Sequence, residues 1–589
     1  MKSKFLLSIL FLAFSSLQAQ TNCNAVWLRH TCGYTDGINL LGGNVFGDAV
    51  CADPFGNSYN SGYFSGNWFT MDTVIEMNSN RFYINKYNSN GLRIWTAKAK
   101  GTTINSIMSS SRMECDSLGN VYICGIFSVD DSVYLAPNWY PVGSGYIAKY
   151  DSSGNNVWCQ YIPKTSTTSV SFTDMSIANG NLFACGIMNF GTISFGTFNL
   201  TSTQPQNGII TKLDLNGNVL QAEFLDPNST NEVYGIEVSK YSNNVYLVGQ
   251  HLNSSLNVDG FNLPIIPDAT NSFIIKMNNT LTAQWARSGY THIPTSGSGV
   301  WPTHEKCLTE IELDKLDNIY SIANGNGDTT RFGSLSFIHP HDASYWGWGD
   351  VYLLKYDANG NEQWLRFGSS PENDFVSDLI TDEWGNSTFA AITGYQTSRY
   401  FVFGTDSIDR YHGGIIKYDP NGNVILTKQL QEARVLKRLA LGIDSTFFGT
   451  GGGGLAYAFP YDTLTISECE DTLHAQSSVN YKMVMVKFFD NTSIVTSSNT
   501  NHEIEPLVLM AYPNPLSSIT TLEFSLSENI NVSVEIFDVI GRNVKNITAQ
   551  NYSAGKNSIS IDLSDLNSGI YFCKINLNAN LQTIKLIKR

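Results

Sequence analysis

The residues of this sequence that could bind a ligand gather in one interval, between residues 288 and 350. Aromatic rings beside polar groups can stack on sugar rings or hold a peptide, and histidine with carboxylate can also bind a metal. The spacing does not bring these groups to one point, and the aromatic rings would equally serve to pack long loops onto their own domain. The candidate ligand-binding residues are Trp301, His304, Trp346, Trp348 and Asp350.

Motifs for catalysis are missing from the sequence. The chain has 9 histidines and contains no HExxH, GxSxG, phosphate-binding loop or paired Cys/His motif. We therefore predict no catalytic residue, no metal and no cofactor, and we favour a binding protein over an enzyme. The alternative is a secreted hydrolase or lyase that degrades a polymer, which needs two carboxylates facing each other in one pocket.

Acidic residues recur at the start of short Gly- and Asn-rich turns, as in DPFGN at 53–57 and DANGN at 357–361. An aspartate at this position accepts hydrogen bonds from the backbone of the residues that follow. The alternation of oxygen ligands typical of an EF-hand calcium loop is absent. We therefore expect these aspartates to cap turns rather than to bind calcium. They are Asp53, Asp116, Asp151, Asp214, Asp357 and Asp419.

A lysine-centred motif occurs seven times along the middle of the chain. It joins Lys, an aromatic or apolar residue, a turn and then Trp or Leu, as in KYDSSGNNVW at 149–158, and most copies lie about 63 residues apart. Because these lysines stand beside aromatic residues on predicted strands, we expect them to cover strand surface or to pair with a neighbouring repeat. They are Lys86, Lys149, Lys212, Lys276, Lys355, Lys417 and Lys487.

A second motif, such as DSLGNVYICG at 116–125, also occurs seven times and alternates with the first. Stretches such as VYICG and YIAKY combine β-branched and aromatic residues, which favours strands, and the Asx-Gly steps between them favour hairpin turns. No amphipathic helical period appears beyond the first twenty residues. Each repeat therefore predicts about four antiparallel strands, and seven such units around an axis make a seven-bladed β-propeller, an all-β fold.

The two ends of the repeat region predict how the ring closes. AVWLRH at 25–30 is similar to QWLRF at 363–367, a fourth strand, and the seventh repeat ends at its third strand, VMVKFF at 484–489. We expect the strand around Trp27 to lie beside Lys487 and to complete the seventh blade, which leaves no open sheet edge between the chain ends. The alternative is that AVWLRH is an unrelated strand and the ring closes by packing alone.

The interval from Lys276 to Lys355 is about 16 residues longer than the other intervals. The extra residues fall into two connections, one between successive blades and one between the second and third strands of a blade. In an up-and-down blade both connections emerge on the same face. The candidate ligand-binding residues should therefore gather on one face, where loops on a rigid scaffold tend to carry binding.

Composition and the first residues predict the location of the protein. The chain has 589 residues, 15% of them charged, and a net charge of −15, so it should repel phosphate backbones and have no nucleic-acid partner. Lys2 and Lys4 precede the apolar run FLLSILFLAF, which is typical of a secretory signal peptide over residues 1–20. No other apolar stretch is long enough to span a membrane. We expect a secreted or outer-cell-surface protein that passes through the periplasm.

The ten cysteines lie mostly within apolar, strand-like stretches, where buried thiols are favoured over disulfides. Export permits disulfides all the same. Cys23 with Cys32, near one end of the chain, is the pair that we favour for a disulfide.

Two known families resemble parts of the chain. Residues 25–490 resemble the seven-bladed SBBP-type propeller repeats of secreted bacterial proteins, which implies a fold and little about activity. YPNP at 512–515, FDVIGR at 537–542, LNSGIY at 566–571 and a short basic terminal strand resemble the type A C-terminal sorting domain of the type IX secretion system of Bacteroidota. That resemblance implies recognition at the outer membrane and, commonly, removal of the domain on release or surface attachment.

These observations predict four segments: a signal peptide over 1–20, a seven-bladed propeller over 21–490, a linker over 491–507 and a small β-sandwich over 508–589. The predicted function is a secreted or cell-surface binding or interaction protein exported by the type IX secretion system. Its expected partners are the type IX machinery, through the C-terminal domain, and a glycan or protein ligand of unknown identity. A purely structural surface-layer role is a further alternative.

Overall fold

A computed structural model describes the secondary structure of most residues between 23 and 588, and every regular element within that part is a β-strand. The all-β prediction is confirmed. No helix in the described part could cross a membrane. The predicted signal peptide and linker lie outside the described residues. The residues left out are 1–22, 35–43, 66–67, 72, 77–79, 102–106, 129–131, 136–137, 142, 164–167, 293–307, 326, 328, 339–349, 370–373, 393–399, 404–405, 410–412, 431–435, 444, 454–462, 465–472, 475–481, 491–509, 513, 515, 527–528, 539–541, 554, 578–579 and 589.

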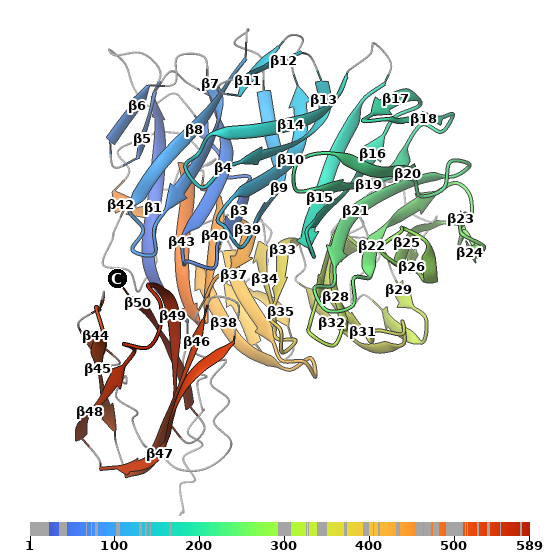
Figure 1. The fold of residues 1–589 in the computed structure, drawn as a ribbon. Coiled ribbons are helices and arrows are strands. Elements are labelled where there is room, and N and C mark those ends of the chain that lie inside the picture. The colour runs from blue at the N-terminus through green and yellow to red at the C-terminus, as the bar shows by residue number, and fades with distance from the viewer. Residues whose placement is uncertain are drawn as a thin grey trace, which may run out of the picture. The chain divides into compact units, whose positions relative to one another are not determined.

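The chain divides into two compact units, Met1–Ile494 and Val495–Arg589. Among its described residues, the first unit contains seven sets of four antiparallel strands, which we call sheets 1 to 7; further strands extend some of them to six or seven strands. Figure 1 labels most of these strands. Sheet 1 contains β3 (Ala49–Ala52), β4 (Ser58–Ser65), β7 (Asn80–Tyr87) and β8 (Arg93–Gly101). Sheet 2 contains β9 (Ile107–Cys115), β10 (Val121–Ser128), β13 (Gly143–Tyr150) and β14 (Asn156–Pro163). Sheet 3 contains β15 (Val170–Ala178), β16 (Asn181–Met188), β19 (Asn207–Asp214) and β20 (Val219–Phe224). Sheet 4 contains β21 (Thr230–Val238), β22 (Val245–Leu252), β25 (Ala269–Met277) and β26 (Ala283–His292).

Sheets 5 to 7 follow the same up-and-down order. Sheet 5 contains β27 (Glu310–Leu313), β28 (Ile319–Gly325), β31 (Asp350–Tyr356) and β32 (Glu362–Ser369). Sheet 6 contains β33 (Phe375–Thr381), β34 (Ser387–Ile392), β37 (Gly413–Tyr418) and β38 (Val424–Leu430). Sheet 7 is β39 (Leu436–Leu441), β40 (Thr446–Gly453), β43 (Lys482–Asp490) and β1 (Cys23–Tyr34).

Sheet 7 is therefore built from both ends of the first unit. β1 pairs antiparallel with β43, with Trp27 opposite Lys487 and Leu28 opposite Val486. Figure 1 shows blue β1 beside orange β43. The predicted pairing of the strand around Trp27 with the last repeat strand is confirmed.

The first strands of the seven sheets contact one another in a closed series. β3 contacts β9, and the contacts continue through β15, β21, β27, β33 and β39 back to β3. Apolar side chains fill the space between successive sheets: Tyr59 and Ile84 of sheet 1 share a buried cluster with Ile123 and Ala148 of sheet 2. Burial of this apolar surface between sheets is the main stabilising contribution to the unit.

The repeated lysines, together with several of the tryptophans, join most sheets to the next. Lys355 Nζ and Trp364 Nε1 of sheet 5 donate to the same carbonyl, Pro420 O of sheet 6, at 2.9 and 3.0 Å, and Lys355 lies over the Tyr320 ring. The lysine contact recurs between other neighbours, from Lys86 to Ser152, Lys149 to Leu215, Lys212 to Asn279, Lys276 to Ala358 and Lys487 to Ser89. For these six lysines, the expectation of pairing with a neighbouring repeat is confirmed.

The repeated aspartates cap turns, as expected. Asp357 Oδ1 accepts hydrogen bonds from the backbone N–H groups of Asn359 and Asn361, and Asp357 Oδ2 accepts one from the Asn361 side chain. The same three contacts hold the turn that starts at Asp116. Because the carboxylate satisfies backbone donors, its role in the turn needs no calcium ion.

The cysteine pairing differs from the prediction. Cys51 of β3 and Cys115 of β9 form a disulfide between sheets 1 and 2. Cys23 and Cys32 lie on one strand, β1, where nine residues span about 30 Å. A disulfide needs its two Cα atoms within about 7 Å, so the predicted Cys23–Cys32 pair is wrong. The buried thiols that were expected are found at Cys124, Cys159, Cys185 and Cys573.

Hairpins extend several sheets at their outer edge. In sheets 1, 2, 5 and 6, the hairpin between the second and third strands pairs with the fourth strand of the preceding sheet. The hairpin of sheet 1, β5 (Trp68–Met71) and β6 (Thr73–Glu76), pairs with β1, and that of sheet 2, β11 (Val133–Leu135) and β12 (Asn138–Tyr140), pairs with β8. The hairpin of sheet 5, β29 (Thr329–Phe332) and β30 (Leu335–Ile338), pairs with β26, and that of sheet 6, β35 (Tyr400–Phe403) and β36 (Asp406–Asp409), pairs with β32. The hairpin β23 (Leu256–Val258) and β24 (Phe261–Leu263) of sheet 4 is instead a two-stranded sheet of its own.

The second unit contains two sheets that share one core. One sheet is β44 (Met510–Tyr512), β45 (Ile519–Leu526) and β48 (Gly555–Asp562), and the other is β46 (Ile530–Asp538), β47 (Asn543–Tyr552), β49 (Gly569–Leu577) and β50 (Asn580–Lys588). Leu522 and Ile561 from the first sheet pack in the same buried cluster as Val534 and Ile575 from the second.

Candidate functional site

The predicted loop site falls mostly outside the described residues. Trp301, His304, Trp346 and Trp348 belong to segments that the structure does not describe, so their role stays a prediction. Asp350 is the first residue of β31, where it lies opposite Gly325 and is buried.

Charged side chains from the first strands meet in a buried cluster. Arg112 of β9 places its guanidinium 3.2 Å from Asp378 Oδ1 of β33 and 3.2 Å from Glu312 Oε1 of β27. Arg438 of β39 contacts the same Asp378 at 3.0 Å and also pairs with Glu310 of β27. Side chains from four different sheets therefore meet at this axial ion-pair cluster.

Burial dominates the titration of this cluster. Burial raises the pKa of Asp174 to about 6 and that of Glu310 to about 7, although both lie near arginines that favour the ionised form. Burial disfavours the charge on Arg112, yet Asp174 and Asp378 outweigh it and raise the pKa of this guanidinium. The arginines thus stay charged while the cluster holds more carboxyl groups than they can neutralise.

The ion pairs of this cluster connect several sheets inside the first unit. Each arginine joins strands that lie far apart in the sequence, and buried pairs of this kind hold their partners in one geometry. Among the residues that the structure describes, no group of three or more His, Cys, Asp or Glu side chains could hold a metal ion. The cluster was not found by sequence reasoning, because Arg112 and Glu312 are 200 residues apart.

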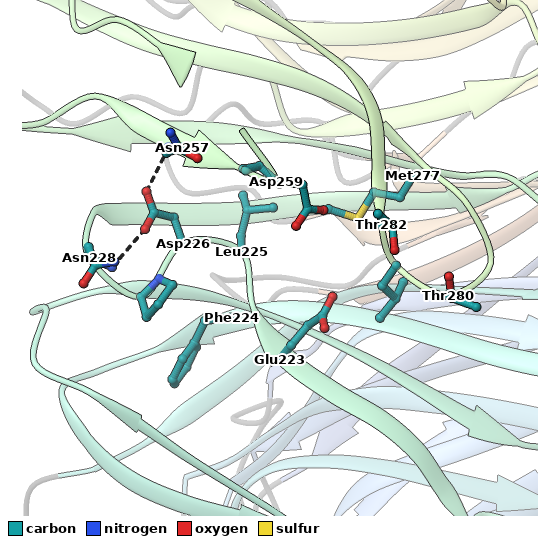
Figure 2. A pocket seen from close by; sticks show the side chains of 13 residues that line it. Glu223, Phe224, Leu225, Asp226, Asn228, Asn257, Asp259, Met277, Thr280 and Thr282 are labelled. Atoms are coloured by element: carbon teal, nitrogen blue, oxygen red, sulfur yellow. Dashed lines mark hydrogen bonds between the residues drawn. The ribbon is translucent and has the colours of Figure 1, made fainter. Parts of the chain in front are cut away.

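A cavity of about 390 Å³ lies between β20, the β23–β24 hairpin and the turn after β25. Figure 2 shows the carboxyl groups of Glu223 and Asp259 pointing into this space. Its floor includes the apolar side chains Leu225, Met277 and Leu281. Sequence reasoning did not identify this cavity.

Carboxylates hold the walls of this cavity in place. Asp226 accepts hydrogen bonds from the backbone N–H groups of Asn228 at 2.9 Å and Asn257 at 2.8 Å, drawn as dashed lines in Figure 2. Asp259 Oδ2 accepts one from the Ala283 N–H at 2.7 Å. Burial, with a further contribution from the negative charge of Asp259, raises the pKa of Glu223.

A third feature is a series of exposed apolar side chains on the turns between first and second strands. Six of the seven sheets carry one, and between 39% and 72% of each residue is exposed. In sheets 1, 2, 4, 5 and 6 it is the second residue after the residue that caps the turn, and in sheet 7 Ile443 lies one place earlier in its turn. We call this set the apolar rim. Its members are Phe55, Leu118, Tyr241, Leu316, Trp384 and Ile443.

Neighbouring turns that carry the apolar rim touch one another. Tyr59 of sheet 1 donates to Gly119 O in the turn of sheet 2, and Lys315 N–H in the turn of sheet 5 donates to Glu383 O in that of sheet 6. Ile443 lies against Gly56, which joins sheet 7 to sheet 1. These contacts join the rim-bearing turns of sheets 7, 1 and 2 and those of sheets 5 and 6. The turn of sheet 3, which comes between those of sheets 2 and 4 in chain order, is Asn179–Gly180 and carries no rim residue.

Turns of the same design elsewhere in the fold carry polar residues. The turns between third and fourth strands use the same capping contacts, with the second residue after the cap donating its N–H to the Asx side chain. That residue is polar in all six such turns: Asn90, Ser153, Asn216, Thr280, Asn359 and Asn421. Turn geometry alone therefore does not explain the apolar residues of the rim.

Comparison with known proteins identifies the C-terminal part of the chain. Residues 510–589 match the family described as the secretion system C-terminal sorting domain. This domain marks proteins that the type IX secretion system exports to the cell surface or the medium, so the chain is a secreted or outer-cell-surface protein. No curated protein matches the chain.

Several solved structures show weak likeness. PorZ, a surface component of the type IX secretion system of Porphyromonas gingivalis, is 9% identical at a TM-score of 0.14, with 96% of this chain and 100% of that chain covered. A putative dipeptidyl aminopeptidase IV from Bacteroides ovatus is 10% identical at a TM-score of 0.31, covering 80% and 63%. Dimeric latent PorU from Porphyromonas gingivalis is 11% identical at a TM-score of 0.13, covering 72% and 34%. At these TM-scores nothing further follows from the likeness.

Proposed function

We propose that the exported chain is a non-enzymatic interaction protein at the cell surface or in the medium, built on a seven-bladed β-propeller of the SBBP type and followed by a C-terminal β-sandwich over about 508–589. Support for the propeller comes from the closed series of contacts among β3, β9, β15, β21, β27, β33 and β39. The pairing of β1 with β43 also supports a ring that is closed by strands from both ends of the repeat region.

The observation that carries the interaction function is the apolar rim. Exposed apolar side chains that gather on one face are typical of a protein contact surface. Five turns carry an apolar residue at this place and the turn of sheet 7 carries Ile443 one place earlier, while the matched turns of the same fold carry Asn, Ser or Thr. Both sets of turns use the same capping hydrogen bonds, so the capping does not account for the apolar residues of the rim. A contact between the rim and another molecule would account for them. We propose that the rim binds a protein partner outside the cell.

Site-specific photocrosslinking in the producing cells tests this function. A benzophenone amino acid replaces Leu118 or Leu316 of the rim in the exported chain, and Asn216 or Asn359 in matched control turns. We expect one discrete higher-mass adduct from each rim position and none from the control positions. Illumination that gives no adduct at the rim, or equal adducts at rim and control positions, would contradict the proposal.

A further inference from the structure

The cavity beside β20 occupies the place where the repeat pairing is interrupted. In sheets 1, 2, 5 and 6 the hairpin between second and third strands continues the preceding sheet by pairing with its fourth strand. In sheets 3, 4 and 7 the corresponding hairpin forms a two-stranded sheet of its own: β17 (Gly191–Phe195) with β18 (Phe198–Ser202), β23 with β24, and β41 (Thr463–Leu464) with β42 (Leu473–His474). In sheet 4 the space between this hairpin and β20 is the cavity of about 390 Å³. The cavity therefore lies at one of the three hairpins that do not extend the preceding sheet.

Side-chain contacts keep this space open. Asp226, at the end of β20, accepts a hydrogen bond from the hairpin N–H of Asn257, and Asp259 at the hairpin tip accepts one from Ala283 at the start of β26. These two contacts anchor β23 and the tip of the hairpin. The result is a groove with defined walls, since each anchoring carboxylate is fixed by a backbone donor.

The lining combines an apolar floor with anionic walls. Leu225, Met277 and Leu281 form the floor, while the Glu223 and Asp259 carboxyl groups point into the space (Figure 2). Among the described residues, no group of three or more His, Cys, Asp or Glu side chains could hold a metal ion. A positively charged group on a short carbon chain complements the two carboxylates and the small area of floor that is apolar.

We propose that this groove binds an alkylammonium group, with the carbon chain on the apolar floor and the ammonium between Glu223 and Asp259. Two sources carry this chemistry, the lysine side chain of a peptide and a free polyamine. The raised pKa of Glu223 fits this role, because a bound ammonium would relieve the repulsion from Asp259 and the effect of burial on the carboxylate. The proposal is independent of the apolar rim.

Isothermal titration calorimetry on the full chain at pH 7.5 tests the groove with two probes, spermidine and the peptide acetyl-Ala-Lys-Ala-Lys-Ala-amide. The variants are Glu223→Gln, which keeps the shape of the side chain, and Glu362→Gln as a matched control. Glu362 is also a half-buried glutamate on a fourth strand, β32, outside the cavity. Thermal unfolding of each variant shows that the fold is retained.

We expect saturable binding of at least one probe, weakened about tenfold by Glu223→Gln and unchanged by Glu362→Gln, because one charge-assisted hydrogen bond is lost. The probe that binds more tightly identifies the source. The proposal is overturned if neither probe binds, if both variants weaken binding equally, or if submillimolar calcium displaces the probe. None of these results bears on the photocrosslinking test of the rim.

Discussion

Trp27 lies directly opposite Lys487 in sheet 7, although 460 positions separate them in the sequence. A strand close to the start of the chain thereby becomes the fourth strand of the last sheet. Such pairing ties the ends of the first unit together, and the sheet cannot form until almost the whole unit has been made. Long-range pairing of this kind also predicts slow folding, since the loop between the strands must close first.

Arg112 should be essential for stability. Replacing it with methionine removes the arginine partner of the largely buried Glu312 and leaves Asp378 with Arg438 alone. We expect the free energy of unfolding, measured by urea denaturation at pH 7, to fall by about 3–5 kcal/mol. Arg112→Lys keeps the charge and should lose less. A loss below about 1 kcal/mol for Arg112→Met would show that the cluster contributes little.

The stability of the first unit should fall as the pH rises from about 5 to 8. Folding raises the pKa of Asp174 to about 6 and those of Glu237 and Glu310 to about 7, mainly through burial. A group with a raised pKa in the folded state contributes its full stability below its unfolded pKa and loses it as the pH rises through the folded pKa.

Denaturant titrations at pH 5 and pH 8 measure this effect, which we expect to be on the order of 2 kcal/mol. The Glu310→Gln variant should show a smaller difference between the two pH values, because one titrating carboxyl is removed. Stability that rises across this range would mean that other groups dominate. Turn aspartates such as Asp151 and Asp214 have lowered pKa values, so their loss of stability lies at lower pH.

The contacts between sheets 5 and 6 should be cooperative. Lys355 and Trp364 both donate to Pro420 O, so Lys355→Met or Trp364→Phe alone should lower the free energy of unfolding by about 1–2 kcal/mol. Because the two residues share one acceptor, the double variant should depart from the sum of the single effects. Trp139→Phe, at an exposed position of β12, serves as the control and should change stability little. Equal losses for Trp139 and Trp364 would contradict this account.

Reduction of the disulfide between sheets 1 and 2 should destabilise the first unit. Cys51 and Cys115 are 64 residues apart, and a bond that closes such a loop contributes about 2–5 kcal/mol. We expect the double variant Cys51→Ser with Cys115→Ser to lose stability by this amount, and the wild type to match it in reductant. Peptide mapping of the exported chain under non-reducing conditions should recover the linked peptides; free thiols at both positions would refute the pairing.

Much of the fold could be predicted from the sequence because the same pattern of turns and strands recurs at a regular spacing. The similarity of AVWLRH at 25–30 to the other fourth strands was enough to pair β1 with β43. The predicted Cys23–Cys32 pair is wrong because the nine-residue separation is a stretch of one extended strand, which holds the two residues far apart in space. The alternation of side chains along a strand predicts which face of the sheet each residue lies on. It does not predict which distant strand packs against that face.

The sites were harder to predict for the same reason. The axial cluster joins Arg112 to carboxylates 62 to 266 residues away, and no local spacing reports such contacts. The cavity arises where a hairpin fails to pair, which repeat spacing does not reveal. The apolar rim, in contrast, was present as a signal: Leu118 and Asn359 occupy equivalent places in two sets of turns, and comparing the sets would have revealed it.

Closure of the ring by β1 is tested most directly by an engineered disulfide across the seam. Leu28 and Val486 are paired across β1 and β43, at a Cα separation that suits a disulfide in an antiparallel pair, whereas Leu28 and Val484 are offset by two residues. Mass spectrometry of the non-reduced chain should find the 28–486 link nearly complete in Leu28→Cys with Val486→Cys, and little 28–484 link in Leu28→Cys with Val484→Cys. Absence of the 28–486 link, or equal linkage in both variants, would contradict closure by this strand.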